Sequence, residues 1–480
     1  MIKIRKGLDL PIGGTAERCV TDARCGGLYA VRPTDYVGLV PRLAVEVGDH
    51  VAAGDPLLCD KHDERVRFVS PVDGVVKAIV RGEKRMLQAV VVESQGHESG
   101  NDGAHSPSSL PDLGLAPSAL REAMLQQGLW PLLRSRPFGT VASPDAHPKA
   151  AVVSFFDSAP LAPDYDFVLQ GREGDVCKGL EVLSKLDVGR LYLCFRPGSW
   201  LKSAVERCSL LQHSDMQTVE VEGPHPAGNV GTLIAQLCPI NKGETVWTMT
   251  PQDVAVLGHW AATGRYCPER IVAVAGPQAK NPHYYRVMAG ACVEPLVRSQ
   301  VLNPDYPALS MREESWRHVR VVSGNVLSGE RIPFDGFLGA YDSLITLVPE
   351  GDYYDFMGWL LPGLDKFSFS RTFVSGFMRL LGKAKLLNDV GMAYRFDTSL
   401  HGGVRPLVFT GDMERVFPFD IYPLQLLKAC MVGDVELMEK LGIYEVEPED
   451  FALCEFIDPS KTEMQAVIRQ ALETLRKEAL

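Results

Sequence analysis

The sequence lacks the residue spacings of a metal site or of a disulfide framework. Its eleven cysteines include no CxxC pair, and none of its eleven histidines stands near another at the spacing of a zinc site. The charged N-terminus is not followed by an apolar stretch, so no signal peptide is predicted. We therefore expect no metal site, and we expect the cysteines to be reduced thiols that pack as small apolar side chains.

Glycine is plentiful but does not form the patterns that hold phosphate. No two of the 44 glycines are separated by a single residue, which excludes the GxGxxG dinucleotide motif. The sequence also has no GxxxxGK(S/T) loop, no GxSxG elbow and no HExxH motif. A phosphate-bearing cofactor normally needs a glycine loop at the start of a helix, because only glycine lets the backbone N–H groups come close enough. No such cofactor is predicted for this chain.

Charge and hydropathy exclude two further classes of protein. The net charge is −11 and there is no basic run, which makes nucleic-acid binding a poor fit. No segment approaches the roughly 18 apolar residues of a membrane span. Any contact with a membrane is therefore expected to occur through partner proteins.

Residues 37–93 contain two similar β-rich halves. Valines alternate with polar residues over 45–51, and Asp73-Gly74 marks a hairpin in the second half. The pattern resembles the barrel-sandwich fold of biotinyl and lipoyl carriers, and it predicts such a β domain over residues 1–95. The position of the carrier lysine is taken by Asp63, so we expect a structural module and not a carrier.

Three further units follow, which makes the predicted fold class a multidomain α/β protein. Residues 113–295 alternate apolar and helical runs, as in a Rossmann-like α/β domain with a parallel sheet. Residues 316–352 are β-rich with interspersed glycines and predict a small β-grasp domain, whereas residues 353–480 end in amphipathic helices. The clearest runs are strands at 150–156, 191–195 and 270–275 and helices at 179–186, 199–208 and 252–263.

A series of landmarks occurs in order along the chain. They include Lys6-Gly7-Leu8-Asp9-Leu10-Pro11-Ile12, Tyr36-Val37-Gly38, Gly128-Leu129-Trp130, Arg136-Pro137-Phe138, Gly223-Pro224-His225-Pro226-Ala227-Gly228, Val322-Ser323-Gly324 and Pro418-Phe419-Asp420. Together they resemble the family of the A subunits of sodium-translocating NADH:quinone reductases. The resemblance implies an SLBB-like β-grasp domain. It also implies a peripheral subunit on the cytoplasmic side of the bacterial inner membrane, which handles quinone beside the other subunits of the complex.

The family in turn resembles the flavin-binding subunit of respiratory complex I and the C subunit of the Rnf complex. Where those relatives have a glycine-rich FMN loop, residues 128–138 here are bulky, and the tail offers only Cys430 and Cys454 for an iron–sulfur cluster. Two cysteines cannot supply the four thiolates that such a cluster usually needs. The resemblance therefore implies no intrinsic cofactor, with the flavins and iron–sulfur centre in partner subunits and quinone as the substrate.

Two segments are candidates for contact with quinone, because both combine cationic and aromatic side chains. The candidate residues are Arg134, Arg136 and Phe138 in the first segment, and Trp359, Phe367 and Arg371 in the second. No catalytic residue is predicted. Two alternatives stay open: an assembly subunit with no ligand site, and a flavin enzyme with an unrecognised FMN site.

Overall fold

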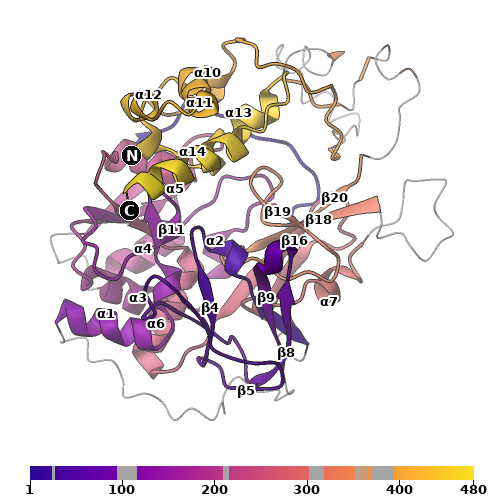
Figure 1. The fold of residues 1–480 in the computed structure, drawn as a ribbon. Coiled ribbons are helices and arrows are strands. Elements are labelled where there is room, and N and C mark those ends of the chain that lie inside the picture. Colours follow the sequence, from indigo (N-terminus) through magenta and orange to yellow (C-terminus); the bar gives the residue numbers. More distant parts are fainter. Residues whose placement is uncertain are drawn as a thin grey trace.

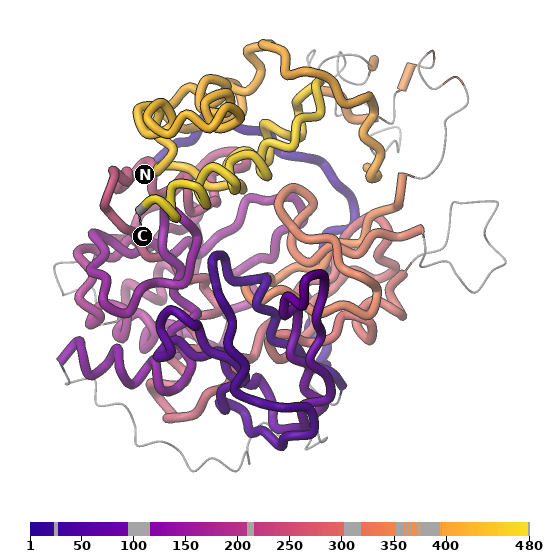
Figure 2. The backbone as a smooth tube through the Cα atoms, in the orientation of Figure 1, coloured from indigo at the N-terminus to yellow at the C-terminus, as the bar shows by residue number. Residues whose placement is uncertain are grey.

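The computed structural model describes most of the chain. The described residues are 1–23, 27–94, 116–208, 216–301, 318–351, 357, 360, 362–363, 366–369, 373–374, 394 and 396–479. Figure 2 shows the N-terminal domain in dark purple and the C-terminal segment in yellow at opposite ends of the molecule, with the middle of the chain, in magenta and salmon, between them. Among the described residues, no helix combines the length and the apolar character needed to cross a bilayer.

The N-terminal domain consists of two small antiparallel sheets. One sheet has the order β3-β9-β8-β5 and the other β4-β6-β7. The strands are β3 (Leu28–Val31), β4 (Pro41–Leu43), β5 (His50–Val51), β6 (Pro56–Asp60), β7 (Arg67–Val69), β8 (Gly74–Arg81) and β9 (Leu87–Ser94). Val90 and Val92 are fully buried in this domain, because alternate residues of a strand point to one face. Leu57 and Leu58 are adjacent and both fully buried, at a point where the pairing of β6 with β7 is irregular. A 3-10 turn, η1 (Pro33–Asp35), connects β3 to the rest of the domain.

The α/β domain is built on a seven-stranded sheet in the order β1-β14-β13-β12-β15-β10-β11. Its strands are β1 (Ile2–Lys3), β10 (Arg134–Arg136), β11 (Thr140–Val141), β12 (Ala150–Ser154), β13 (Leu191–Phe195), β14 (Met216–Glu222) and β15 (Val246–Thr248). The first five strands in this order are parallel, and β10 and β11 are antiparallel additions. Every residue of β12 and β13 is buried, as expected for strands covered on both faces. This confirms the strands predicted there from continuous apolar runs.

Helices cover both faces of this sheet. They are α1 (Pro117–Gln126), α2 (Tyr165–Val168), α3 (Glu173–Ser184), α4 (Trp200–Arg207), α5 (Val230–Leu237) and α6 (Pro251–Thr263), with a 3-10 turn η3 (Trp130–Leu132) after α1. Helices α1, α3, α4, α5 and α6 lie together on the left of Figure 1. Alternate residues of β12 belong to different core clusters: Ala151 and Val153 pack with α3 and α6, whereas Ala150 and Val152 pack with α5.

Helices α3 and α6 approach each other through Gly179 and Gly258. A Cβ atom at Gly258 would collide with the carbonyl oxygen of Asp175, so Gly258→Ala must push the two backbones apart. We expect this change to lower the free energy of unfolding by about 1–3 kcal/mol, measured by chemical denaturation. Gly174→Ala in the first turn of α3 is the control, since it meets nothing within 4 Å and should be neutral or stabilising by up to about 1 kcal/mol. Equal effects at the two glycines would contradict the close approach.

A second large sheet has the order β19-β18-β20-β16-β17-β2. Its strands are β2 (Glu17–Asp22), β16 (Glu269–Ala275), β17 (His283–Met288), β18 (Val319–Ser323), β19 (Glu330–Ile332) and β20 (Leu344–Pro349), and the short helix α7 (Glu294–Val297) follows β17. Residues 269–288 fall inside the range predicted for the α/β domain, yet β16 pairs with β20 and not with the seven-stranded sheet. The sheet that holds β18 and β20 therefore begins at residue 269 and not at 316, and it also recruits β2 from the N-terminal region.

The described C-terminal residues form a compact group of helices, drawn in orange and yellow in Figure 1. They are α10 (Met413–Val416), α11 (Pro423–Val432), α12 (Val435–Lys440), α13 (Ala452–Ile457) and α14 (Met464–Ala479), with 3-10 turns η6 (Ile443–Glu445) and η7 (Pro448–Phe451). These helices bury their own apolar cluster, and Leu8 of the N-terminal segment packs against it. The first and last parts of the chain therefore lie side by side.

One expectation for the cysteines is wrong. Cys177 in α3 and Cys208 after α4 are joined by a disulfide, although we expected every cysteine to be a free thiol. Spacing alone does not reveal this pair, because the two residues are 31 positions apart and are brought together by the packing of α3 against α4.

An interdomain cavity as the candidate functional site

A cavity of about 60 Å³ lies where the N-terminal domain meets the two larger sheets. The N-terminal domain contributes the segment around η1 and the end of β7, the α/β domain contributes η3 and α6, and the second sheet contributes the start of β16 and the loop before β20. Its principal lining residues are Arg32, Asp35, Tyr36, Phe68, Pro71, Pro131, Leu132, Asp253, Tyr266, Arg270, Leu338 and Ala340. Three separate units therefore have to assemble before this site exists.

Aromatic rings form one wall of the cavity. The ring of Tyr36 lies 4.4 Å from that of Phe68 and 5.7 Å from that of Tyr341, edge to face in both cases. Burial raises the pKa of Tyr36 and of Tyr266 well above the usual range. Both phenols therefore keep their protons at physiological pH and can donate hydrogen bonds.

A buried ion pair forms the polar end of the cavity that lies against α6. Thr250 caps α6 by accepting the backbone N–H of Asp253, and the Arg270 Nη2 group donates to Asp253 Oδ1 at 2.6 Å. The Nε and Nη1 groups of Arg270 have no hydrogen-bond partner among the described residues. Buried donors normally have partners, so two free N–H groups beside a cavity are suited to an acceptor on a ligand.

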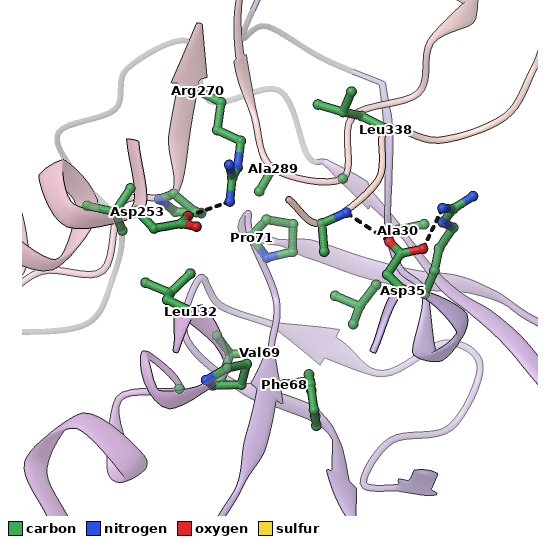
Figure 3. A pocket seen from close by; sticks show the side chains of 18 of the residues that line it. Ala30, Asp35, Phe68, Val69, Pro71, Leu132, Asp253, Arg270, Ala289 and Leu338 are labelled. Carbon is green, nitrogen blue, oxygen red and sulfur yellow. Dashed lines mark hydrogen bonds and ion pairs between the residues drawn. The ribbon is translucent and has the colours of Figure 1, made fainter. Parts of the chain in front are cut away.

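A second ion pair stands on the other side of the cavity. Asp35 is paired with Arg32 and accepts the backbone N–H of Ala340 at 2.9 Å, while Arg32 also contacts Glu330 at 2.7 Å. Burial raises the pKa of Asp35 to about 6, against the opposing effect of Arg32. Figure 3 shows Asp253 and Arg270 on one side of Pro71 and Asp35 on the other.

The first predicted quinone segment only touches this cavity. Its early part, at Pro131 and Leu132, lines the cavity. The guanidinium of Arg134 stacks 4.5 Å from the ring of Tyr341, whose hydroxyl donates to the Pro131 carbonyl. Arg134 therefore lies behind the aromatic wall and supports it.

Arg136 and Phe138 face the C-terminal helices instead. Arg136 is 7% exposed, its Nε lies 3.1 Å from Glu447 Oε1 and its Nη1 lies 3.7 Å from Asp450 Oδ2, and it also pairs with Glu449. The ring of Phe138 packs edge-on against Tyr444. The structure thus uses these two residues to join the α/β domain to the C-terminal helices.

Of the three candidate residues in the second predicted segment, Phe367 is the one that lies among the described residues. Its ring lies among those of Tyr394, Phe396 and Phe456, so it packs against α13. Trp359 and Arg371 lie outside the described residues. In the part of the chain that is described, no three His, Cys, Asp or Glu side chains are arranged to hold a metal ion.

Sequence reasoning missed the residues that line the cavity. A signal existed for Arg270, because it directly precedes the apolar run 271–275, and a charged residue that is buried with such a run needs a partner. The partner, Asp253, stands in the first turn of a predicted helix, where an acidic residue is ordinary. Neither residue points to a cavity without the three-dimensional arrangement.

Comparison with known proteins defines the class of this chain. Residues 2–95 match the family described as the NqrA N-terminal barrel-sandwich hybrid domain, which confirms the predicted fold of that region. Residues 115–266 match the NqrA second alpha/beta domain, and residues 271–307 match the NQRA C-terminal domain of SLBB type. The transition at 266–271 coincides with the start of β16 in the second sheet.

Curated relatives agree over the whole length. Proteins named as the A subunit of Na(+)-translocating NADH-quinone reductase from Hahella chejuensis and Neisseria meningitidis are each 36% identical over 479 residues, and one from Pasteurella multocida is 36% identical over 480. Each comparison covers 100% of both chains. The chain belongs to the family formed by the A subunits of the Na+-translocating NADH-quinone reductases. A solved NAD+-reducing nickel–iron hydrogenase is similar over 76% of this chain and 67% of its own, at 13% identity and a TM-score of 0.37, which is too low to support an argument.

Proposed function

We propose that this chain is the peripheral, cytoplasmic-side subunit of a sodium-pumping NADH:quinone oxidoreductase, and that it contributes to quinone binding there. The names of relatives that match its full length support membership of such a complex. Membrane contact through integral partner subunits would bring a protein of net charge −11 to a substrate dissolved in the bilayer.

The interdomain cavity is the observation on which the quinone role rests. A quinone is a flat ring with a carbonyl acceptor at each end, and such a ligand is held by aromatic walls and a few donors. Tyr36 and Phe68 supply the wall, and the two free N–H groups of Arg270 supply donors to a carbonyl. A well-formed ligand pocket holds roughly 300–1,000 Å³, so a cavity of about 60 Å³ must widen when a ring enters. Because its walls belong to three units, small shifts between them would widen it.

We further propose that the flavins and iron–sulfur centre of the complex lie in partner subunits. Burial raises the pKa of the Cys430 thiol to about 12 and raises that of Cys454 further. Thiols of this kind resist conversion to the thiolate that binds iron. The two cysteines therefore serve as apolar side chains within the C-terminal helices, which is consistent with a colourless purified chain.

Arg270→Lys tests the quinone site, because lysine keeps the charge beside Asp253 but loses the guanidinium fork. We expect a quinone analogue to bind the variant about 10-fold to 100-fold more weakly, since hydrogen bonds to charged groups contribute about 1.5–3 kcal/mol. Fluorescence titration of the purified chain measures the affinity, and thermal unfolding verifies that the variant is folded.

Arg298→Lys is the matched control, because Arg298 is exposed and forms its ion pair with Glu294, one turn earlier in the chain. The affinity of the Arg298→Lys variant for the quinone analogue should equal that of the wild type. A photoreactive quinone should label peptides that contain Tyr36, Phe68 or Leu132. Labelling of residues 359–371 instead would move the site to the second predicted segment, and absence of binding would favour the alternative of an assembly subunit.

A further inference from the structure

The cavity contains a carboxyl group whose role goes beyond binding. Asp35 lines it from η1, and Arg270 lines it from β16 on the opposite side of Pro71 (Figure 3). The two carbonyl oxygens of a para-quinone lie at opposite ends of the ring. A ring that accepts hydrogen bonds from Arg270 at one end therefore presents its other carbonyl towards Asp35.

We propose that Asp35 is a catalytic residue that donates a proton to the quinone during its reduction in this cavity. This inference rests on the proposed quinone site. The electrons come from a reduced flavin or iron–sulfur centre of a partner subunit, which is oxidised as the quinone is reduced.

Each quinol formed requires two electrons and two protons. At the carbonyl facing Asp35, the O–H bond of the carboxylic acid breaks, a new O–H bond forms on the quinone oxygen, and the carboxylate that remains is stabilised by Arg32. The oxygen held by Arg270 takes its proton from water when the cavity opens for release. Arg270 stays charged throughout, as expected for a guanidinium.

The surroundings of Asp35 provide a route for recovering the proton. Its side chain is 8% exposed, so water can reprotonate the carboxylate directly, while the guanidinium of Arg32 stays charged beside it. Asp253 has no such route, because it is fully enclosed and already accepts from Thr250 and Arg270. This difference in access favours Asp35 as the donor.

The charged and titratable groups around Asp35 set its proton affinity. Arg32 stands beside it on its own turn, Asp342 and Tyr341 face it from the loop before β20, and Glu330 reaches it through Arg32. Burial, reinforced by Asp342, raises its pKa to about 6 although Arg32 opposes this. A general acid is most effective when its pKa lies near the working pH.

Asp35→Asn in the assembled complex tests the proposal, because the amide oxygen can still accept the Ala340 N–H but the group cannot donate an acidic proton. We expect kcat for quinone reduction to fall about 100-fold or more, with KM for quinone changed by less than about 3-fold. The decline of wild-type kcat above about pH 6 should be absent from the variant, and Asp35→Glu should recover much of the rate.

Asp342→Asn is the matched control, since this buried carboxyl accepts from Ser323 in the same region but does not line the cavity. Its kcat should stay near that of the wild type, and its pH profile should keep the decline of the wild type, moved to slightly lower pH because Asp342 raises the pKa of Asp35. An unchanged kcat in Asp35→Asn, or a fall matched by an equal loss of analogue affinity, would overturn the proposal. Failure of the wild-type chain to bind the analogue would instead refute the quinone site itself, so the two failures can be distinguished.

Discussion

Replacing Arg136 with methionine should lower the free energy of unfolding by about 3–5 kcal/mol, which is the usual cost of removing one partner from a buried ion pair. Methionine preserves most of the apolar stem but removes the cation that pairs with Glu447 and Glu449 and lies 3.7 Å from Asp450. The side chains of Glu447 and Asp450 are at most 9% exposed, so water cannot replace the guanidinium. Arg136 lies on β10, and the acidic residues lie on and beside η7. The substitution should therefore weaken the contact between the α/β domain and the C-terminal helices.

Lys242→Met is the control for this experiment. Lys242 also joins the α/β domain to the C-terminal helices, through an ion pair with Glu439 at 2.7 Å, but its side chain is 71% exposed. A surface pair of this kind contributes about 0–1 kcal/mol. Chemical denaturation of both variants should therefore give a large loss for Arg136 and a small one for Lys242, and similar losses would contradict the structural role given to Arg136.

The environment of Arg136 could not be predicted from the local sequence. The pattern of residues 134–138 indicates a basic, aromatic loop open to a ligand, because nothing within the segment neutralises the charge. In the structure, Arg134–Arg136 is a strand that pairs with β15, about 110 residues away, and its counter-charges lie more than 300 residues away. A short local pattern carries no information about partners at that separation.

Continuous apolar runs predicted the positions of strands more reliably than the pattern of residues 134–138 predicted a ligand site. The predicted strands at 150–156 and 191–195 are found as β12 (Ala150–Ser154) and β13 (Leu191–Phe195), which are buried on both faces as such runs indicate. The strand at 270–275 was also predicted correctly as an element, but not its sheet. An alternation of apolar and helical runs predicts that a strand is present, but it does not predict which strand lies beside it. The neighbour of β16 is β20, which is about 70 residues away in the sequence.

The cavity was beyond prediction for the same reason. Asp35, Phe68, Leu132 and Arg270 come from separate elements, and each is ordinary in its own segment. What makes them a site is that the turn η1, strand β7 and the start of β16 meet at one point. The family resemblance implies quinone as the ligand, but it directs attention to one segment that lies beside this cavity and to a second whose described residue Phe367 packs against α13.

Asp450→Asn should change the pH dependence of stability more than any other single substitution among the described carboxylates of this cluster. Burial raises the pKa of Asp450 to about 8, although Arg136 favours the ionised form. The carboxyl group also packs directly against Gly231 in the first turn of α5, where there is no room for a hydration shell. The folded protein therefore holds a proton on Asp450 that the unfolded chain releases near its ordinary pKa of about 4.

The sign of the effect follows from proton counting. Between about pH 4 and pH 8 the folded state binds more protons than the unfolded state, so wild-type stability falls as pH rises, by up to about 1.4 kcal/mol per pH unit from this group. Asparagine resembles the neutral acid in shape and never ionises, so the variant should lose this slope and be more stable than the wild type near pH 8. Glu447, whose pKa burial also raises, remains in both proteins, and it also raises the pKa of Asp450. The slope that the variant loses is therefore that of Asp450 together with its interaction with Glu447. Denaturant unfolding at pH 5, 6.5 and 8 measures the difference, and parallel curves for the two proteins would show that Asp450 is already ionised in the folded state.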